Sequence, residues 1–360
     1  KLIVLDEPTS QLDPVATDDL LATLSRLASD RGATIVLADH RIERALSLVD
    51  RVIVFERGQL AIDGTPQEFL ERAAESDTLN HLLPPLAELF DRAGLRPLPI
   101  DARAARTQLA GVEVATAPVR QASPGAAVLT LRGVKHEYAG STQPALQGVD
   151  LALGAGERVA LLGANGSGKS TLLRIAHGVQ TAGCGEAIRG GEVALLLQNP
   201  NDYLIHERVA DEAPLDSLAS FGLEPFAERD PRDLSGGERQ RLALAIVTQG
   251  DPVALLLDEP TRGMDQARKL ELAAMLREIA GSGTAVMVAT HDAEFAANFA
   301  ERAVLLGGGK VLADAPAPAV LGRGWHFATA TARLFPGSGL LTPADGAAAL
   351  RAAGSQGGGS

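Results

Sequence analysis

The sequence predicts an α/β protein whose core is a mostly parallel β-sheet with helical layers. Two observations carry this prediction. Short apolar strands alternate with helical stretches through residues 2–40 and again through residues 159–290, and a glycine-rich turn joins one of these strands directly to an amphipathic helix. Strands that alternate with helices usually pair in parallel, because each helix carries the chain back across the sheet.

Composition narrows the possible classes of protein. The 360 residues, 46% hydrophobic and 22% charged, are typical of about two soluble globular domains. No apolar run approaches the roughly 18 to 20 residues that cross a bilayer, so any membrane role must come through a partner. The net charge of -12 argues against the broad basic surface of nucleic-acid-binding proteins, although a local basic groove stays possible. The only cysteine, Cys184, excludes a disulfide framework and a cysteine-based zinc site.

An internal repeat organises the chain. Residues 2–9 (LIVLDEPT) reappear as residues 254–261 (ALLLDEPT), and each copy continues through a helical stretch (18–30; 267–280) and a short apolar strand (34–38; 284–289). The corresponding residues are Asp6 and Asp258, Glu7 and Glu259, Asp13 and Asp265, and His40 and His291. A repeat of this size indicates two related domains.

The two copies differ in what precedes them. About 130 residues come before the second copy that have no counterpart before the first, and the chain opens inside an apolar strand. We therefore expect the first domain to lack its N-terminal part. Residues 89–95 are echoed by residues 334–340, which indicates a C-terminal appendix on each copy. The expected segments are the first copy (1–72), its appendix (73–110), a linker (111–126), the complete second copy (127–321), and a second appendix with a flexible Gly/Ser-rich tail (322–360).

The glycine-rich turn carries the first chemical motif. An apolar strand at residues 159–162 runs into residues 163–170 (GANGSGKS), which match the P-loop pattern at every fixed position. Such a loop curls its backbone N–H groups around phosphates, Lys169 reaches the terminal phosphates and Ser170 coordinates Mg²⁺. The expected ligands are ATP and Mg²⁺. The expected ATP contacts are Gly163, Asn165, Gly166, Ser167, Gly168, Lys169, Ser170 and Thr171.

A pair of carboxylates follows a second strand. The apolar run 253–257 ends at Asp258 and Glu259, at the end of the strand where open α/β sheets place their ligands. Because neighbouring strand residues point to opposite sides, we expect the two acids to differ in role. Asp258 is expected to hold Mg²⁺ through water, and Glu259 to face the attacking water as a general base.

A third motif lies between these two. Residues 234–241 (LSGGERQR) precede an apolar helical face, so that Ser-Gly-Gly opens a helix and forms a second anion-binding N-terminus. A single nucleotide does not easily need two such termini from one domain. The second terminus therefore points to a nucleotide that is held by another copy.

The ordered set of motifs resembles the ATP-binding-cassette (ABC) ATPase family, fully over residues 128 to about 320 and partially over residues 1 to about 70. The resemblance implies a P-loop NTPase fold with a mostly parallel core, an antiparallel β subdomain and a helical signature subdomain. It also implies a head-to-tail dimer that holds ATP between the P-loop of one cassette and the Ser-Gly-Gly signature of the other.

The resemblance further implies roles for single residues. Ser235 and Gly237, in a signature completed by Gly236 and Glu238, would contact the partner's γ-phosphate; Glu238 stands where the family more often has Gln. Gln198 would link Mg²⁺ and the lytic water to a transmembrane partner, and His291 would touch the γ-phosphate. Tyr138 would stack on adenine. The remaining matches are Asp265 in the D-loop and the first-copy residues Asp6, Glu7, Asp13 and His40.

Several features resemble the ATPases of energy-coupling-factor (ECF) importers, which take up vitamins or metal ions. They are the tandem copies, the appendices, and the sequences at residues 38–43 (ADHRIE), 198–200 (QNP) and 260–265 (PTRGMD). This resemblance implies a membrane coupling subunit docked near residues 198–212 and a small substrate-binding membrane protein. The chain would then lie peripherally on the cytoplasmic face of the cell membrane.

Two other interpretations stay open. A soluble twin-cassette protein acting on ribosomes or DNA typically carries a long charged linker, a coiled-coil insertion or zinc-binding cysteines, none of which occurs in the sequence. A catalytically dead scaffold would keep the fold without turnover. Because the first copy lacks a P-loop and a signature, we expect this chain to bind ATP but to hydrolyse it poorly unless two second cassettes pair. The cargo is not specified by the sequence.

Overall fold

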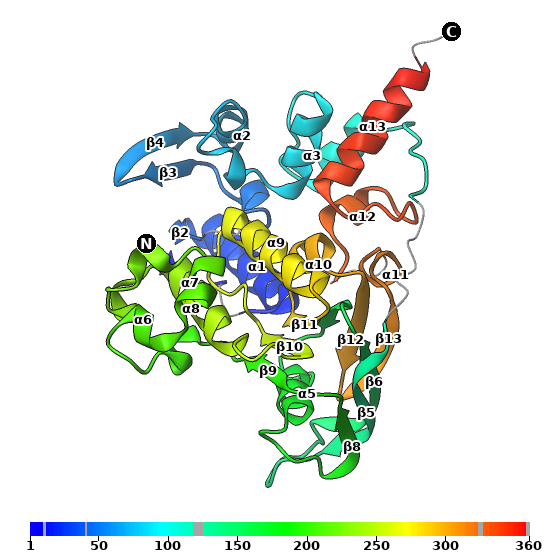
Figure 1. Ribbon diagram of the computed structural model, residues 1–360. Coiled ribbons are helices and arrows are strands. Elements are labelled where there is room, and N and C mark those ends of the chain that lie inside the picture. Colours follow the sequence, from blue (N-terminus) through cyan, green and yellow to red (C-terminus); the bar gives the residue numbers. More distant parts are fainter. Residues whose placement is uncertain (10–11, 40–41, 118–124, 323–326, 358–360) are drawn as a thin grey trace. The chain divides into compact units, whose positions relative to one another are not determined.

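A computed structural model describes residues 1–9, 12–39, 42–117, 125–322 and 327–357 (Figure 1). The chain divides into two compact units. Unit 1 comprises residues 1–119, 265–267 and 318–360, and unit 2 comprises residues 120–264 and 268–317. No helix in the described part of the chain is long and apolar enough to cross a membrane.

The core of unit 2 is a six-stranded sheet in the order β13-β12-β7-β11-β10-β9, parallel except for the edge strand β13. Three of its strands, β9, β10 and β11, are buried along their whole length. Such strands are apolar throughout because both faces of the sheet are covered. The strands are β7 (Arg158–Leu162), β9 (Val193–Leu196), β10 (Ala254–Asp258), β11 (Ala285–Thr290), β12 (Arg302–Gly307) and β13 (Lys310–Pro316).

Helices cover both faces of this sheet. On β10, Leu256 packs into the core that contains the helix α5 (Lys169–His177), while Leu255 and Leu257 pack on the opposite side. This alternation follows the two-residue period of a strand. The helices on the second side are α8 (Gly236–Val247), α9 (Gln266–Gly281) and α10 (Ala293–Phe299).

Two smaller substructures complete unit 2. The antiparallel sheet β6-β5-β8 shares its core with α5. A helical part before and around α8 has a separate small core. The elements are β5 (Ala127–His136), β6 (Leu146–Gly154), β8 (Cys184–Arg189), η3 (Pro200–Tyr203), α6 (Val209–Glu212), α7 (Leu215–Ser220), η4 (Glu224–Phe226) and η5 (Pro231–Asp233). The fold class predicted from the sequence is therefore confirmed.

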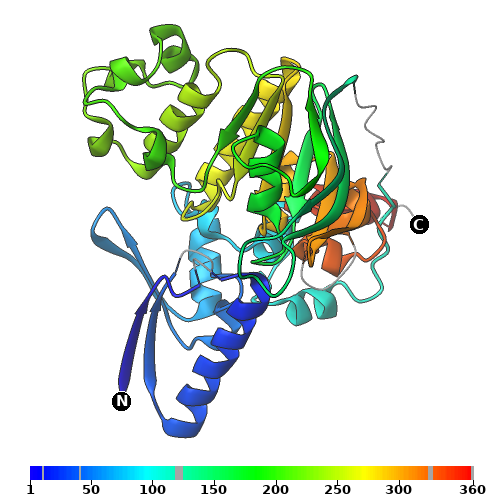
Figure 2. The ribbon, with the colours of Figure 1, turned by 90° about the horizontal axis from the view of Figure 1, so that it is seen from below.

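Unit 1 begins with two small sheets. The parallel pair β1 (Leu2–Asp6) and β2 (Thr34–Ala38) is joined by α1 (Pro14–Arg31), which lies along the pair in Figure 2. The antiparallel pair β3 (Val52–Glu56) and β4 (Gln59–Gly64) follows the short helix η1 (Leu46–Leu48). Helix α1 starts four residues before its predicted start, because the Asp13 carboxylate accepts hydrogen bonds from the first turn and Pro14 occupies the first helical position.

The repeated sequence has the same backbone geometry in both units. Glu7 and Glu259 both have a left-handed backbone, with φ of 42° and 49°. The amide of Glu7 donates to the carbonyl of Ala38 at 2.8 Å, and that of Glu259 donates to the carbonyl of Ala289 at 2.9 Å. The chain thus makes the same turn after β1 as after β10.

The hairpins repeat as well. Arg51 forms a two-pronged ion pair with Asp63 across β3 and β4, and Arg302 forms the same pair with Asp314 across β12 and β13. Both hairpins contain a register shift, which lies between Val54 and Phe55 in β3 and between Leu305 and Leu306 in β12. The pKa of Arg302 is raised, and the largest cause is the hydrogen bond to Asp314.

The surroundings of the two copies differ. Leu2 and Val4 of β1 are 67% and 66% exposed, whereas the corresponding Ala254 and Leu256 of β10 are fully buried. In unit 2 these positions face the core shared with α5. The described part of unit 1 places no comparable layer over that face of β1.

The second part of unit 1 is a helical core that contains both predicted appendices. Leu89 and Phe90 pack in the same cluster as Leu334 and Phe335, so the two echoing segments share one core. The helices of this core are α2 (Pro66–Ala74), η2 (Asn80–Leu82), α3 (Pro85–Ala93), α4 (Ala102–Gln108), α12 (Ala330–Leu334) and α13 (Pro343–Gly357). The short helix α11 (Ala317–Leu321) begins at the last residue of unit 2.

The predicted linker is partly packed. Val114 and Ala117 lie against this helical core, and the amide of Ala117 donates to the carbonyl of Ser338 at 2.7 Å. The first half of the segment 111–126 is therefore part of unit 1, whereas residues 118–124 lie outside the described residues.

The helical core gives a test of stability. We expect Phe90→Ala, at a side chain with 0% exposure, to lower the free energy of unfolding by about 3 to 5 kcal/mol, because it removes a large apolar side chain and leaves a cavity. Urea denaturation followed by circular dichroism measures the change. The matched control is Phe55→Ala, at a side chain that is 71% exposed, where we expect a loss below about 1 kcal/mol. Equal losses for the two variants would contradict the packing.

Candidate functional site

The P-loop joins β7 to α5 in the predicted way, and two of its glycines are sterically required. A Cβ on Gly163 would lie 2.4 Å from the carbonyl oxygen of Leu306, and one on Gly168 would lie 2.4 Å from that of Ala145. Gly168 also has a φ of 105°, which side chains disfavour. The tight approach of the loop to its neighbours therefore explains the glycines independently of any ligand.

Lys169 is the centre of the site. Its side chain is only 6% exposed, and its ammonium group donates to the carbonyls of Gly163 at 2.7 Å and Ala164 at 3.2 Å. The same nitrogen lies 3.5 Å from Oε1 of Glu259. The predicted P-loop lysine and the predicted general base are thus brought together.

The two adjacent carboxylates differ in their surroundings, but not for the reason expected from the sequence. Asp258 is the last residue of β10, whereas the left-handed backbone of Glu259 takes it out of the strand. Strand alternation therefore does not decide where Glu259 points. Asp258 interacts with the hydroxyl of Ser170, and Glu259 contacts Lys169 and His291.

The charges around Asp258 suit a divalent cation. Burial raises the pKa of Asp258; a hydrogen bond from Ser170 opposes the rise and the charge of Glu259 adds to it. Oδ1 of Asp258 is buried without a hydrogen-bond partner among the described residues, and the buried oxygens of Glu259 lie 3.5 Å from Nζ of Lys169 and 2.9 Å from Nδ1 of His291. A hydrated Mg²⁺ would satisfy such oxygens and favour the charged carboxylate, so these residues fit the predicted metal.

His291 follows β11, and its Nδ1 lies 2.9 Å from Oε2 of Glu259. The next residue, Asp292, caps α10 by accepting from the amide of Phe295, and its other oxygen accepts from Nζ of Lys269 at 2.6 Å. Burial alone would raise the pKa of Asp292, but the Lys269 ammonium and the Phe295 amide lower it to about 2. The chain next to His291 is therefore fixed by an ion pair that the sequence analysis missed.

The signature sequence opens α8 as predicted. Ser235 is the N-cap, and Gly236 and Gly237 are the first helical residues. Oε2 of Glu238 accepts from the amide of Ser235 at 2.6 Å while the hydroxyl of Ser235 accepts from the amide of Glu238, a capping box. The bond from the Ser235 amide lowers the pKa of Glu238. A Ser followed three residues later by Glu is the sequence pattern of a capping box, so this helix start could have been predicted from the sequence.

The segment around Gln198 is held by a residue that the sequence analysis did not single out. Gln198 is exposed and comes two residues after the end of β9. The hydroxyl of Tyr203 donates to the carbonyl of Leu195 at 2.8 Å and accepts from the amide of Leu197 at 2.9 Å. Tyr203 thus fixes the backbone immediately before Gln198.

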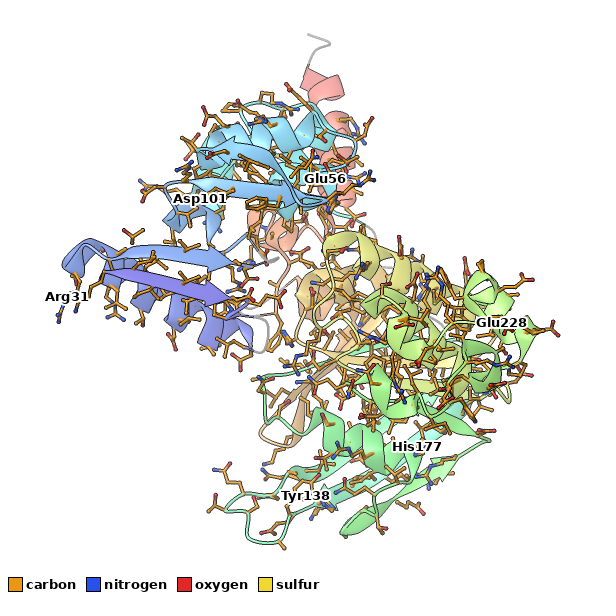
Figure 3. The ribbon with its side chains drawn as sticks, turned by 90° about the vertical axis from the view of Figure 1, so that its left-hand side faces the viewer. Arg31, Glu56, Asp101, Tyr138, His177 and Glu228 are labelled. Carbon is orange, nitrogen blue, oxygen red and sulfur yellow. The ribbon has the colours of Figure 1, made fainter. Side chains whose placement is uncertain are left out.

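Tyr138 lies on the loop after β5 and is labelled in Figure 3. Its side chain is exposed, and its hydroxyl is 3.1 Å from the hydroxyl of Thr171 in α5. Partial burial raises the pKa of Tyr138, but bonds with Thr171 and Gln180 and the charge of Arg174 outweigh that effect and lower it. The predicted adenine platform is therefore attached to the helix that follows the P-loop.

The first-copy residues lie in unit 1. Asp6 and Glu7 are exposed at the end of β1, and Asp13 caps α1. His40 lies outside the described residues. Asp265 directly precedes α9. Of this set, Asp13 has an evident structural role that accounts for its presence.

Comparison with known proteins places the chain in a family. Residues 146–262 match the family described as ABC transporter. An ABC transporter ATP-binding protein of Streptomyces coelicolor is 37% identical to this chain, over 95% of it and 70% of the relative. A second, from Bacillus thuringiensis, is 32% identical over 88% of this chain and 63% of the relative. The chain belongs to the ABC transporter family of ATP-binding proteins, and residues 146–262 belong to its ATPase cassette.

One solved structure supports the fold. The structure of cbiO1 from Clostridium perfringens, described as part of the ABC transporter complex cbiONQ, is similar with a TM-score of 0.51 and 24% identity. The match covers 55% of this chain and 91% of that protein. The chain spans only part of the length of the relatives that it matches: 70% of the Streptomyces protein and 63% of the Bacillus protein.

The Lys269–Asp292 pair gives a prediction about pH. The pKa of Asp292 falls from 3.8 to about 2 on folding, so the pair stabilises the fold above pH 4 and this contribution is lost as the pH falls toward 2. We expect Asp292→Asn to lose about 2 kcal/mol at pH 7, and less at pH 2. Denaturant unfolding across this pH range measures it. Asp216→Asn, at an exposed residue of α7, is the control; a pH profile of Asp292→Asn equal to that of the wild type would refute the argument.

Proposed function

We propose that the chain is the ATP-hydrolysing part of an ECF-type importer of a vitamin or a metal ion, with ATP hydrolysis in the second cassette driving movement of membrane partners. The observation that carries the ATPase part is the contact of Lys169, Glu259 and His291 at the ends of three neighbouring strands. The importer part is supported by the tandem repeat and by the sequences at residues 198–200 and 260–265.

The chemistry that we propose is in-line attack of water on the γ-phosphate. Lys169, buried and held by P-loop carbonyls, is placed to stabilise negative charge on the phosphate oxygens. Glu259 orients the water and accepts its proton, and its contact with His291 keeps the carboxylate in place. Ser170, Asp258 and Gln198 would hold Mg²⁺, which supplies positive charge beside the phosphates.

We further propose that two cassettes complete each site. The N-terminus of α8 presents Ser235, Gly236 and Gly237, with the helix dipole directed at an anion. In this arrangement the signature of one cassette covers the ATP held by the P-loop of the other. The repeated geometry around Glu7 and Glu259 supports the interpretation of residues 1–72 and 127–321 as two cassettes of one tandem protein, with appendices at 73–110 and 322–360.

The membrane partners would dock on the segment from Gln198 to Glu212. This segment is exposed over much of its length, and Ile205 is 77% exposed. An apolar side chain that is so exposed suits burial in a partner interface. We propose a transmembrane coupling subunit there, with a substrate-binding membrane protein beside it, which would place the chain peripherally on the cytoplasmic face of the membrane.

The catalytic assignment predicts two different losses. We expect Glu259→Gln to keep ATP affinity and to lower turnover roughly 100- to 10,000-fold, because it removes the general base. Lys169→Ala should weaken ATP binding itself, because it removes the charge beside the phosphates. Phosphate release and calorimetric titration with ATP measure the two effects. Equal turnover of the wild type and Glu259→Gln would refute the assignment.

The pairing of cassettes predicts a dependence on protein concentration. We expect turnover per molecule to rise with concentration at low protein, with a second-order onset, and Ser235→Arg to abolish the rise, because the added bulk and charge block the signature surface. Brisk turnover by a strict monomer would show that pairing is not needed.

The importer assignment is tested by purification of the full-length protein from its native membranes, with mass spectrometry of the proteins that accompany it. We expect two small hydrophobic membrane proteins, one of which binds a vitamin or a metal ion. Ribosomal proteins or DNA in their place would keep the ATPase chemistry and overturn the transport role.

A further inference from the structure

Tyr138 belongs to a hydrogen-bonded chain of four side chains. Its hydroxyl lies 3.1 Å from the hydroxyl of Thr171 and donates to Oε1 of Gln180 at 3.3 Å. The amide nitrogen of Gln180 lies 2.7 Å from Nε2 of His136. The imidazole of His136 in turn contacts the Tyr138 ring, with centroids 4.8 Å apart and planes 80° from parallel. Tyr138, Gln180 and His136 thus form a closed circuit, and Thr171 joins it through the Tyr138 hydroxyl.

The directions of these bonds are mutually consistent. A tyrosine hydroxyl has one proton, so when it donates to Gln180 it must accept from Thr171. The Gln180 amide then has its N–H free to donate to the lone pair of His136, whose proton lies on Nδ1. Nδ1 of His136 is buried without a hydrogen-bond partner among the described residues. The hydrogen bond from Gln180 to Nε2 is therefore the polar contact that orients the imidazole.

The circuit joins elements that are distant in sequence. His136 is the last residue of β5, Thr171 lies in the first turn of α5 and is 7% exposed, and Gln180 follows the end of α5. Thr171 is two residues after Lys169. The circuit therefore ties the Tyr138 ring to the same helix turn that holds the phosphate-binding lysine.

We propose that Thr171, Gln180 and His136 form a cradle that fixes the Tyr138 ring for stacking on the nucleotide base, and so determines how much the base contributes to affinity. The proposal rests on the proposed ATPase function and on the adenine-stacking role that the family resemblance implies for Tyr138. Tyr138 is 43% exposed while its hydroxyl is hydrogen-bonded, the combination that a stacking platform needs. A ring that is fixed before binding avoids the ordering cost that a mobile ring incurs.

The cradle should affect the affinity for the nucleotide base and not the affinity for the phosphates. In the full chain we compare ATP with tripolyphosphate, which lacks the base, by calorimetric titration in Mg²⁺. We expect Tyr138→Ala to weaken ATP binding about 5- to 100-fold, the range of one base stack, with tripolyphosphate affinity unchanged. Tyr138→Phe, Gln180→Leu and His136→Phe, which keep side-chain volume but break the circuit, should weaken ATP binding roughly 3- to 10-fold, again with tripolyphosphate unchanged.

Controls separate the possible failures. Gln67→Leu makes the Gln→Leu change on α2 in unit 1 and should leave both affinities unchanged. If Tyr138→Ala weakens ATP binding but Tyr138→Phe and Gln180→Leu bind as the wild type does, the cradle is wrong and the stacking role stands. If Tyr138→Ala has no effect, both are wrong. If the circuit variants weaken ATP and tripolyphosphate equally, the residues stabilise the fold and the cradle is again overturned. A wild type that binds neither ligand would instead refute the proposed ATPase function.

Discussion

The buried ammonium of Lys169 is the constraint on which the nucleotide site depends. A lysine that is 6% exposed would be costly without partners, and here its partners are two P-loop carbonyls and Glu259. These contacts join the end of β7 to the end of β10, which are separated in the sheet by β11. His291, at the end of β11, contacts Glu259 from that position. Three neighbouring strand ends are therefore coupled through one buried charge.

Much of this site could be predicted because its motifs are local. The strand 34–38 was predicted with its observed bounds, and the P-loop lies, as predicted, between the strand β7 and the helix α5. Other features follow no sequence motif. The hydroxyl of Tyr203 holds the backbone at Leu195 and Leu197, a local contact that depends on how the segment after β9 bends. Lys269 pairs with Asp292, 23 residues away, and a single sequence gives no register between two such distant segments.

The two copies of the repeat show which features the local sequence determines and which depend on the surrounding elements. The ion pairs Arg51–Asp63 and Arg302–Asp314 have matching geometry, yet Arg302 also contacts Glu157 and is 22% exposed, against 64% for Arg51. The two-pronged pair is thus set by the hairpin, and burial by the elements around it. The left-handed Glu7 and Glu259 follow the same rule, since the backbone agrees while the surroundings differ.

Helix α5 transmits these constraints through the site because both of its ends are fixed. At its start, Gly168 approaches the carbonyl of Ala145 so closely that no side chain fits. At its end, the guanidinium of Arg189 donates to the carbonyls of Ile175 and Ala176, each at 2.7 Å, which satisfies groups that a helix C-terminus leaves unpaired. A helix held in this way cannot shift without breaking one of these contacts. The distance between the phosphate loop and the Tyr138 ring, which α5 connects through Thr171, is consequently a property of the folded chain before any nucleotide binds.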